Sequence, residues 1–312
     1  MTAVYVLFAF SILFPAYTYI VYPIILGIFA RFEKIQQYPK SEKKPAVAVV
    51  VVGDNVEEKI KNVQQCLYTN MEVISGDYVS VPSAEIIVFT DSETRIDKMA
   101  IHEIVKPFSD DRVGCVVGQQ TNPNGNSAFW VYENKVRNLE SKLGCVSGAP
   151  SSLFAVRTSC MPKVEEHVLN KPFFIATKIA ENKYAVVFQD SAKAYELNTE
   201  GINFSKHVRD AAGYWQALKL FPGMLGSFSY VSHRVLKWFV WLNMIILIGT
   251  SGILSLNGDK FMLLVWWIQV VGYIVVVALG RKKLTGIVGK LISIGNYFVM
   301  LNVAYFIGMF KG

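Results

Sequence analysis

Two carboxylates stand two residues apart in the segment Asp91-Ser92-Glu93, directly after a run of apolar and β-branched residues. Carboxylate oxygens placed in this way at the end of a strand could hold a Mg²⁺ or Mn²⁺ ion. The same residues would also serve as an acidic turn that caps the following helix. The sequence leaves both interpretations of Asp91 and Glu93 open.

The softer metal ligands show no such spacing. The cysteines are far apart and form no C-x-x-C motif, and the histidines match no ligand pattern, which argues against a zinc site and a disulfide framework. We therefore expect reduced thiols in the cytosol and histidines with ordinary structural roles. The residues concerned are Cys66, Cys115, Cys145, Cys160, His102, His167, His207 and His233.

The composition indicates that membrane segments accompany the domain that carries these residues. Apolar residues make up 52% of the 312 residues and charged residues only 18%, whereas soluble domains have about 25% charged residues. No charge occurs from Ala3 to Ala30, which exceeds the roughly 20 residues of a bilayer-spanning helix. No Lys or Arg precedes this run, so it predicts an uncleaved anchor, kinked at Pro15 and Pro23, rather than a signal peptide.

Three further apolar segments follow near the C-terminal end. They are residues 239–256, residues 261–280 and residues 284–310, the last with Lys290 as its one charge. Basic residues cluster at 31–44 and 281–283, whereas the loop 257–260 is nearly neutral. The positive-inside rule then places the large central domain in the cytoplasm and both termini outside. Contact with the lipid bilayer explains the net charge of +7, so nucleic acid is not an expected partner.

Residues 46–210 read as one α/β domain with a mostly parallel sheet, because buried β-branched runs alternate with helical spacing. Strands are predicted at 46–52, 84–90, 113–118, 153–157 and 185–189, and helices at 56–67, 98–108, 127–143 and 174–182. Residues 62–83 predict no strand. A basic linker at 31–45 precedes the domain. Residues 211–238 predict amphipathic helices on the membrane surface, with packing against the domain as the alternative.

Several segments, in this order, resemble the membrane-bound family-2 glycosyltransferases, which are inverting enzymes that use nucleotide sugars on a GT-A fold. The resemblance extends over nearly the whole chain, including Tyr22-Pro23 in the first span and the pairs Tyr132-Glu133 and Glu140-Ser141 in a helix. The longer motifs are residues 49–60 (VVVVGDNVEEKI), 84–94 (AEIIVFTDSET), 113–118 (VGCVVG), 148–157 (GAPSSLFAVR), 170–175 (NKPFFI), 184–196 (YAVVFQDSAKAYE), 204–213 (FSKHVRDAAG) and 232–236 (SHRVL).

The resemblance implies roles for five residues. Asp91 and Glu93 fall on the metal motif, and Asn55 falls on the turn that contacts the nucleotide. Lys206 and Arg209 stand where basic residues face phosphate. Surface positions beside a membrane would explain these last two residues equally well.

The departures from the family fall on catalytic positions. The acidic pair that should contain the base corresponds to Lys171 and Pro172, with Asn170 and Phe173 fixing the register. A shift of the preceding loop could recruit Glu165 or Glu166, although a solvated loop explains them better. The carboxylate of the acceptor-side motif is replaced by Pro150. The interval 62–83 lacks the family's second nucleotide-binding strand, so a β-α unit is expected to be deleted.

These departures predict a catalytically impaired subunit in cell-envelope polysaccharide or glycan synthesis, in the plasma (inner) membrane. Its partner would be an active glycosyltransferase or an assembly complex, and it would bind nucleotide sugars weakly or not at all. The alternative is an active hexosyltransferase that uses Mg²⁺ or Mn²⁺ on Asp91 and Glu93 and a substitute base such as Glu166. A membrane scaffold that binds no ligand is a third possibility.

Overall fold

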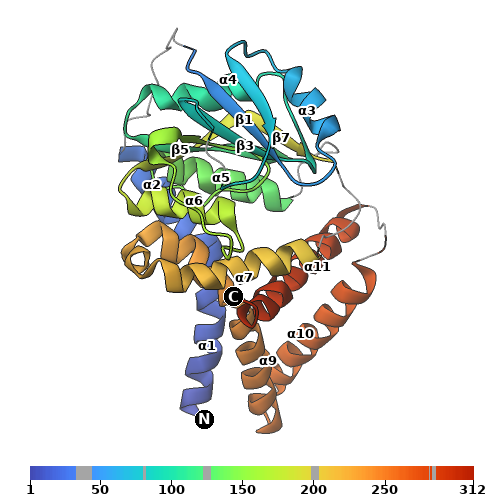
Figure 1. The fold of residues 1–312 in the computed structure, drawn as a ribbon. Coiled ribbons are helices and arrows are strands. Elements are labelled where there is room, and N and C mark those ends of the chain that lie inside the picture. Colours follow the sequence, from blue (N-terminus) through green and yellow to red (C-terminus); the bar gives the residue numbers. More distant parts are fainter. Residues whose placement is uncertain (33–43, 80–81, 122–127, 198–203, 281, 283–285) are drawn as a thin grey trace. The chain divides into compact units, whose positions relative to one another are not determined.

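The computed structural model describes residues 1–32, 44–79, 82–121, 128–197, 204–280, 282 and 286–312 (Figure 1). The chain forms two compact units, each of which is described here by itself. The sheet unit comprises Leu26–Glu200 and Gln216–Ser229, and the helical unit comprises Met1–Ile25, Gly201–Trp215 and Tyr230–Gly312.

The sheet unit is built on one seven-stranded sheet with the order β2-β1-β3-β6-β5-β7-β4. Its strands are β1 (Val47–Val52), β2 (Met71–Ser75), β3 (Ile86–Asp91), β4 (Thr94–Ile96), β5 (Val113–Thr121), β6 (Phe154–Arg157) and β7 (Ala185–Glu196). The strand pairs β1/β2, β1/β3 and β5/β7 are parallel, and β6 and β4 run against their neighbours. Among the described residues five strands therefore share one direction, which confirms the prediction of a mostly parallel sheet in an α/β domain.

Helices cover both faces of this sheet, which is why β1 is a continuous run of apolar residues. On one face α3 (Glu57–Gln64) and α4 (Ala100–Val105) pack against a cluster that includes Val49 and Val88. On the other face α6 (Lys171–Glu181) packs against a cluster that includes Val50 and Phe89. The helix α5 (Ala128–Lys142) packs on β7.

The sequence predicted no strand between residues 62 and 83, and this prediction is wrong. The strand β2 pairs in parallel with β1, with Val49 opposite Val73. It escaped notice because it is a short edge strand whose residues are only partly buried. After β2 the chain turns at Asp77, whose Oδ1 accepts a hydrogen bond from the Val79 amide at 2.9 Å. Tyr78 then packs on the Phe89 ring, with 5.2 Å between ring centroids, and the described residues between β2 and β3 contain no helix.

The other predicted elements of the sheet unit are confirmed, with shifted ends. The strands β5 and β7 are longer than predicted, because a register shift beyond Gly118 lets the pair continue with Gln119 opposite Lys193. The helix α6 begins three residues earlier than predicted. Its first turn is capped by Asn170, whose side chain accepts a hydrogen bond from the Phe173 amide at 3.2 Å.

The helical unit consists of apolar helices and two π-helical segments. Its elements are α1 (Thr2–Ala16), the π-helix η1 (Tyr17–Val21), the start of α2 (Tyr22–Phe32), the first part of α7 (Phe204–Leu220), the π-helix η5 (Tyr230–Val235), α8 (Leu236–Trp238), α9 (Val240–Leu256), α10 (Lys260–Leu279) and α11 (Gly286–Met309). Aromatic packing holds α7 and α8 together, since Tyr214 stacks on Trp238 at 5.2 Å. Trp215 Nε1 donates a hydrogen bond to the Tyr305 carbonyl of α11 at 2.8 Å.

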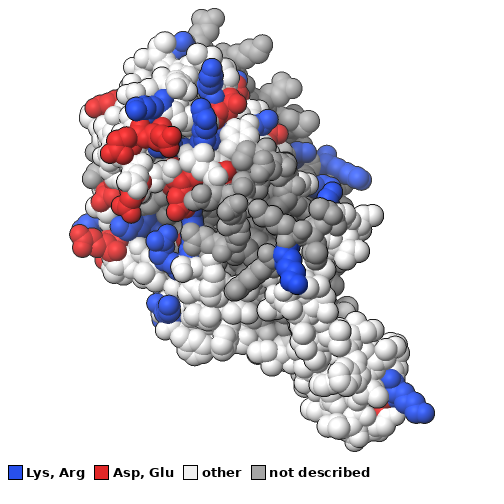
Figure 2. Space-filling model, turned by 90° about the vertical axis from the view of Figure 1, so that its right-hand side faces the viewer, with Lys and Arg blue, Asp and Glu red and all other residues white. Residues whose placement is uncertain are grey.

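The described helices include three that are long and apolar enough to cross a membrane: Thr2–Phe32, α10 and α11. A fourth candidate is the pair Tyr230–Trp238 and α9, which is bent by 54°. On the face drawn in Figure 2, the apolar helices show few charged side chains, and most of the coloured residues lie over the sheet unit. These candidates match the four predicted spans in place and order.

Candidate functional site

The carboxyl ends of β1 and β3 bring two loops into contact, and parallel α/β sheets bind ligands at this edge. Asp91 is the last residue of β3 and lies opposite Val52 of β1. The Ser92 amide donates to the Val52 carbonyl at 2.9 Å. Gly53 has φ +121°, and a Cβ there would lie 2.5 Å from Ser92 Oγ. A residue with a side chain would be strained at this φ and would collide with Ser92. The loop after β1 therefore lies directly against the turn after β3.

The two carboxylates of the candidate metal motif have different surroundings. Asp91 is buried, and its Oδ2 accepts a hydrogen bond from Ser151 Oγ at 2.7 Å. Glu93 is exposed, and its backbone carbonyl accepts a hydrogen bond from the Leu197 amide at 3.1 Å. One carboxylate is therefore held within the protein, whereas the other faces solvent from the same turn.

A positive charge lies beneath this turn. Lys59 of α3 has an exposed fraction of 3%, and its Nζ donates to the Thr94 carbonyl at 2.8 Å and to Thr94 Oγ1 at 3.1 Å. Burial lowers the pKa of Lys59 to about 8, and the negative charge of Asp91 acts in the opposite direction. The ammonium is thus mainly protonated at neutral pH. The sequence did not reveal it, because Glu57-Glu58-Lys59-Ile60-Lys61 has the composition of a solvated helix surface.

Thr94 connects Lys59 to a hydrogen-bonded network along the same edge. Ser152 provides the next link, since its carbonyl accepts hydrogen bonds from Thr90 Oγ1 at 2.7 Å and Thr94 Oγ1 at 3.3 Å. Its Oγ donates to Gln120 Oε1 at 3.2 Å, and Gln120 Nε2 donates to Glu196 Oε1 at 2.6 Å. We call these six residues the edge network: Lys59, Thr90, Thr94, Gln120, Ser152 and Glu196. The sequence analysis did not single out Glu196, because only the β4/β7 pairing places it opposite Thr94.

These residues fit a resident Mg²⁺ or Mn²⁺ ion poorly. Within the described part of the chain no three Cys, His, Asp or Glu side chains come together as a metal site. Hard cations take oxygen ligands and are repelled by nearby positive charge. Asp91 already accepts from Ser151, and Lys59 supplies a positive charge under the turn. A metal role for Asp91 and Glu93 stays a prediction.

The expected base position lies in the first turn of α6. Lys171 and Pro172 are its first two residues, after the cap Asn170, and a proline is favourable there because its missing N–H has no helical partner. Gly148 has φ +85°, and a Cβ there would meet the Phe173 ring at 2.3 Å. The loop that contains Gly148 and Ser151 therefore joins this helix start to Asp91. Neither of the first two residues of α6 offers a carboxylate.

The carboxylates that could replace the base lie on an exposed turn before α6. Glu165 and Glu166 are both exposed, and Glu165 Oε2 pairs with His167 Nδ1 at 3.2 Å. Among the described residues, neither side chain is hydrogen-bonded or ion-paired to Asp91. A role for Glu166 as substitute base stays a prediction.

The predicted nucleotide and phosphate contacts are divided between the units. Asn55 is exposed in the loop after β1 and has φ +54°, which asparagine tolerates. Lys206 is half-buried and Arg209 is exposed, and both belong to the helical unit. His207 lies between these two residues in the sequence. Burial, and to a lesser extent the charge of Lys206, lower the pKa of His207 to about 4. The roles predicted for Asn55, Lys206 and Arg209 stay predictions.

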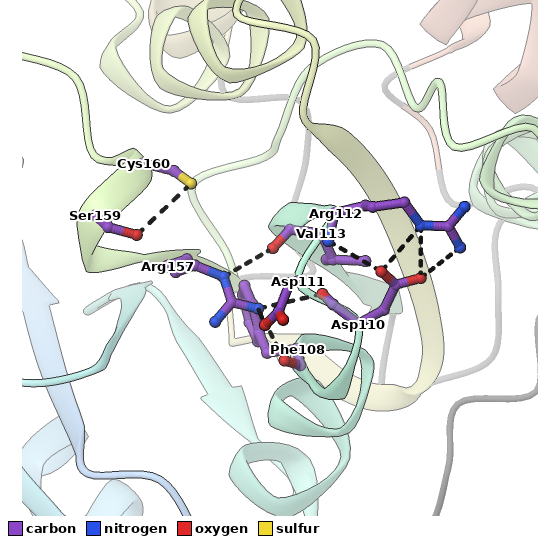
Figure 3. Close-up of polar contacts among 8 residues, drawn as sticks. All are labelled: Phe108, Asp110, Asp111, Arg112, Val113, Arg157, Ser159 and Cys160. Carbon is purple, nitrogen blue, oxygen red and sulfur yellow. Dashed lines mark hydrogen bonds and ion pairs between the residues drawn. The ribbon is translucent and has the colours of Figure 1, made fainter.

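The opposite end of the sheet carries a different polar cluster, which we call the arginine clamp (Figure 3). Arg157 pairs with Ile86 at the amino end of β3. Its Nη2 donates to the carbonyls of Phe108 and Asp110 at 2.8 and 3.2 Å, and its Nε donates to the Val113 carbonyl at 3.3 Å. These bonds fix the loop between α4 and β5, so the clamp has a structural role.

A polar hollow of about 340 Å³ lies beside the irregular part of the β5/β7 pair. Its lining residues are Asp97, Gln119, Asp190, Ser191 and Lys193. None of them was predicted to be functional.

Comparison with known proteins identifies the fold. No protein-family model matches the chain, and no curated protein matches it. Among solved structures it is similar to the mannosyltransferase PcManGT from Pyrobaculum calidifontis in complex with GDP-Man and Mn²⁺, with a TM-score of 0.69, 16% identity and 98% of each chain covered. A glucosyl-3-phosphoglycerate synthase from Mycobacterium tuberculosis, with Mn²⁺, UDP-glucose and phosphoglyceric acid, matches 60% of this chain and 83% of its own at 13% identity. Its TM-score of 0.39 adds no support. The first similarity confirms a GT-A-type glycosyltransferase fold.

Proposed function

We propose that this chain is a membrane-bound relative of the family-2 glycosyltransferases with little or no catalytic activity of its own. It would serve cell-envelope polysaccharide or glycan synthesis as a subunit beside an active glycosyltransferase or an assembly complex. The observation that carries the proposal is the first turn of α6, where Lys171 and Pro172 stand in place of the expected acidic pair.

Inverting transfer requires a base beside the acceptor hydroxyl, because this hydroxyl loses its proton as it attacks the sugar. A lysine is protonated at neutral pH in an ordinary environment, and proline has no acid-base group. The loop packed against this turn brings Ser151 and Pro150 rather than a carboxylate. The chain can thus arrange the walls of a GT-A site while lacking its usual base.

The turn after β2 supports the expectation that nucleotides bind weakly or not at all. The strand β2 is present, but Asp77 at its carboxyl end accepts a hydrogen bond from the Val79 amide. Tyr78 is buried against Phe89 and Phe154. We expect this turn to offer a nucleoside fewer contacts than the corresponding segment of an active enzyme.

The proposed location is the plasma (inner) membrane, with the sheet unit in the cytoplasm and both termini outside. Its support is the clustering of basic residues at 31–44 and 281–283, together with the candidate spans. Reporter fusions after Ser41, Asn257 and Gly312 test this topology. An external signal at Ser41 would contradict it.

One observation favours a second candidate, an active hexosyltransferase. Asp91 is retained at the end of β3, and the similar mannosyltransferase structure contains GDP-Man and Mn²⁺. In such an enzyme Asp91 and Glu93 would meet the metal and Glu166 would act as base. A scaffold without any ligand is the third candidate.

The deciding experiment uses the full chain, purified in mild detergent together with whatever co-purifies. Mass spectrometry identifies the partner, calorimetry tests nucleoside diphosphates with and without Mn²⁺, and a transfer assay covers a panel of nucleotide sugars. We expect a glycosyltransferase or assembly partner, weak or absent nucleotide binding, and no transfer above background. Micromolar nucleotide affinity, or turnover that disappears in Asp91→Ala, would establish the second candidate instead.

Restoring the base alone should not restore transfer. General base catalysis is worth about 10²–10⁴-fold, but the double variant Lys171→Asp/Pro172→Asp leaves the turn after β2 unchanged. We expect its rate to remain near background. Robust activity of this variant would show that the donor is held elsewhere and that the missing base is the sole defect.

A further inference from the structure

We propose that Lys59 is a specificity-determining residue, whose fixed ammonium charge takes the place of a divalent cation beneath the turn Asp91–Glu93 and disfavours Mg²⁺ and Mn²⁺ there. The inference rests on the proposed function only in locating the donor-facing edge of the sheet. It concerns which ion this edge accepts, and not whether sugar is transferred.

The first argument is that the ammonium cannot easily leave. Lys59 lies on α3, and its neighbours Val56, Ile60 and Val63 pack into the core cluster on the same face of the sheet. Their packing fixes the rotation of the helix. With an exposed fraction of 3%, the lysine side chain is enclosed by the protein in this packing.

The second argument is that Lys59 uses the oxygens of the turn itself. Its Nζ donates to the Thr94 carbonyl at 2.8 Å and to Thr94 Oγ1 at 3.1 Å. Carbonyl and hydroxyl oxygens are ligands that hard cations take. Here they are bound to an ammonium, and Thr94 Oγ1 also lies 3.3 Å from the Ser152 carbonyl.

The third argument is the balance of charge. Asp91 is the carboxylate whose charge acts on Lys59, and its Oδ2 accepts from Ser151. Glu93 lies on the exposed side of the turn. A divalent ion that approaches Asp91 would be attracted by the carboxylates and repelled by a nearby ammonium. At the effective dielectric constant of such a site this repulsion is large enough to lower affinity about tenfold or more.

A purely structural lysine would make the same hydrogen bonds, so the test must separate charge from bonding. Lys59→Gln removes the charge and keeps a donor, and Lys59→Met removes both and keeps the apolar stem. Lys61→Gln removes an exposed charge from the same helix and is the matched control. Thermal unfolding of each full-length variant verifies that it is folded.

The probe is Mn²⁺ alone, titrated into the full chain in detergent at pH 7 and followed by electron paramagnetic resonance. We expect millimolar or weaker binding in the wild type and at least about tenfold tighter binding in Lys59→Gln and Lys59→Met. Lys61→Gln should remain within about twofold of the wild type. Adding Asp91→Asn to Lys59→Gln should abolish the gain.

Two results would overturn the inference. One is micromolar Mn²⁺ binding by the wild type that disappears in Asp91→Asn, which needs no Lys59 variant to fold. The other is unchanged Mn²⁺ affinity in a folded Lys59 variant. Transfer assays report on the proposed function separately: sugar transfer without added metal would contradict the impaired subunit and leave the role of Lys59 intact.

Discussion

The strands β3 and β6 run antiparallel and connect two polar clusters of very different kind. At the amino end of β3, Arg157 donates to three carbonyls of one loop. At the carboxyl end, Asp91 and Thr94 are hydrogen-bonded to Ser151, Lys59 and Ser152, which come from two distant segments of the chain. The clamp binds backbone carbonyls of one loop, whereas the carboxyl edge joins side chains and carbonyls of several segments.

This difference separates a structural end from a polar, solvent-facing end within one pair of strands. The backbone pairing is continuous, with Ile86 opposite Arg157 and Phe89 opposite Phe154. Buried polar groups at such an edge are stable provided that each keeps a hydrogen-bond partner. Disruption of the clamp should therefore affect folding, and changes at the edge should affect ligand or metal binding more than folding.

Loss of the clamp should have the largest effect on stability. Arg157→Met removes the guanidinium bonds to the carbonyls of Phe108, Asp110 and Val113, of which Asp110 keeps a bond from the Val113 amide, and should lower the free energy of unfolding by about 3 kcal/mol. Arg112→Met is the control, because the Arg112 side chain is 77% exposed and pairs with Asp110, two residues away in the chain; it should cost about 0–1 kcal/mol. Denaturant unfolding of both variants measures the difference. Equal losses would remove the distinction between clamp and surface pair.

Disrupting the contact between the loop that contains Gly148 and the start of α6 should cause the second-largest loss of stability. Gly148→Ala places a Cβ 2.3 Å from the Phe173 ring at φ +85°, and should cost about 2 kcal/mol or more through strain and displacement of the loop. Gly144→Ala has a similar φ of +65°, but its Cβ would meet Ala185 at an ordinary 3.4 Å. Thermal unfolding of the two variants separates backbone strain from collision. If both variants lose the same stability, the loop is not held against the helix.

A pH effect is expected in the basic segment of α7. Burial lowers the pKa of His207 to about 4 from 6.5, so the unfolded chain binds the proton first. The stabilising contribution is nearly complete above about pH 7 and is lost as the pH falls toward 4, by about 2 kcal/mol between pH 7 and pH 5. His207→Phe should flatten this dependence, and His167→Gln, at an exposed histidine, should not. An unchanged slope in His207→Phe would show that this segment is solvated.

The smallest effect is expected from Glu166→Gln. This side chain is exposed on a turn before α6, so both the unfolding midpoint and any background transfer rate should stay at wild-type values. The measurement is the same unfolding and transfer assay, with Asp91→Ala beside it. A drop in transfer for Glu166→Gln without a change in stability would identify a working substitute base at the altered edge.

Much of the fold could be predicted from sequence, because continuous apolar runs and helical spacing are local signals. The strand β2 was missed since its side chains are only partly buried, and β4 is merely a three-residue partner of β7. Of the residues on the carboxyl edge, the sequence analysis named Asp91 and Glu93, and their roles stay predictions. Lys59 and Glu196 have the composition of surface residues, and they acquire partners only when distant strands pair.

The two π-helical segments of the helical unit lie against each other. Tyr17 of η1 hydrogen-bonds to Ser232 of η5 at 2.9 Å between hydroxyl oxygens, and the rings of Tyr22 and His233 stack at 5.9 Å. A π turn accommodates one residue more than an α turn. Deleting one residue within η1 would convert it to α-helix, and the helix segments before and after it would keep their relative orientation. The same deletion inside α1 would rotate the following segment by about 100° about the helix axis. Among related chains, single-residue insertions and deletions in the first span should therefore concentrate between Tyr17 and Val21.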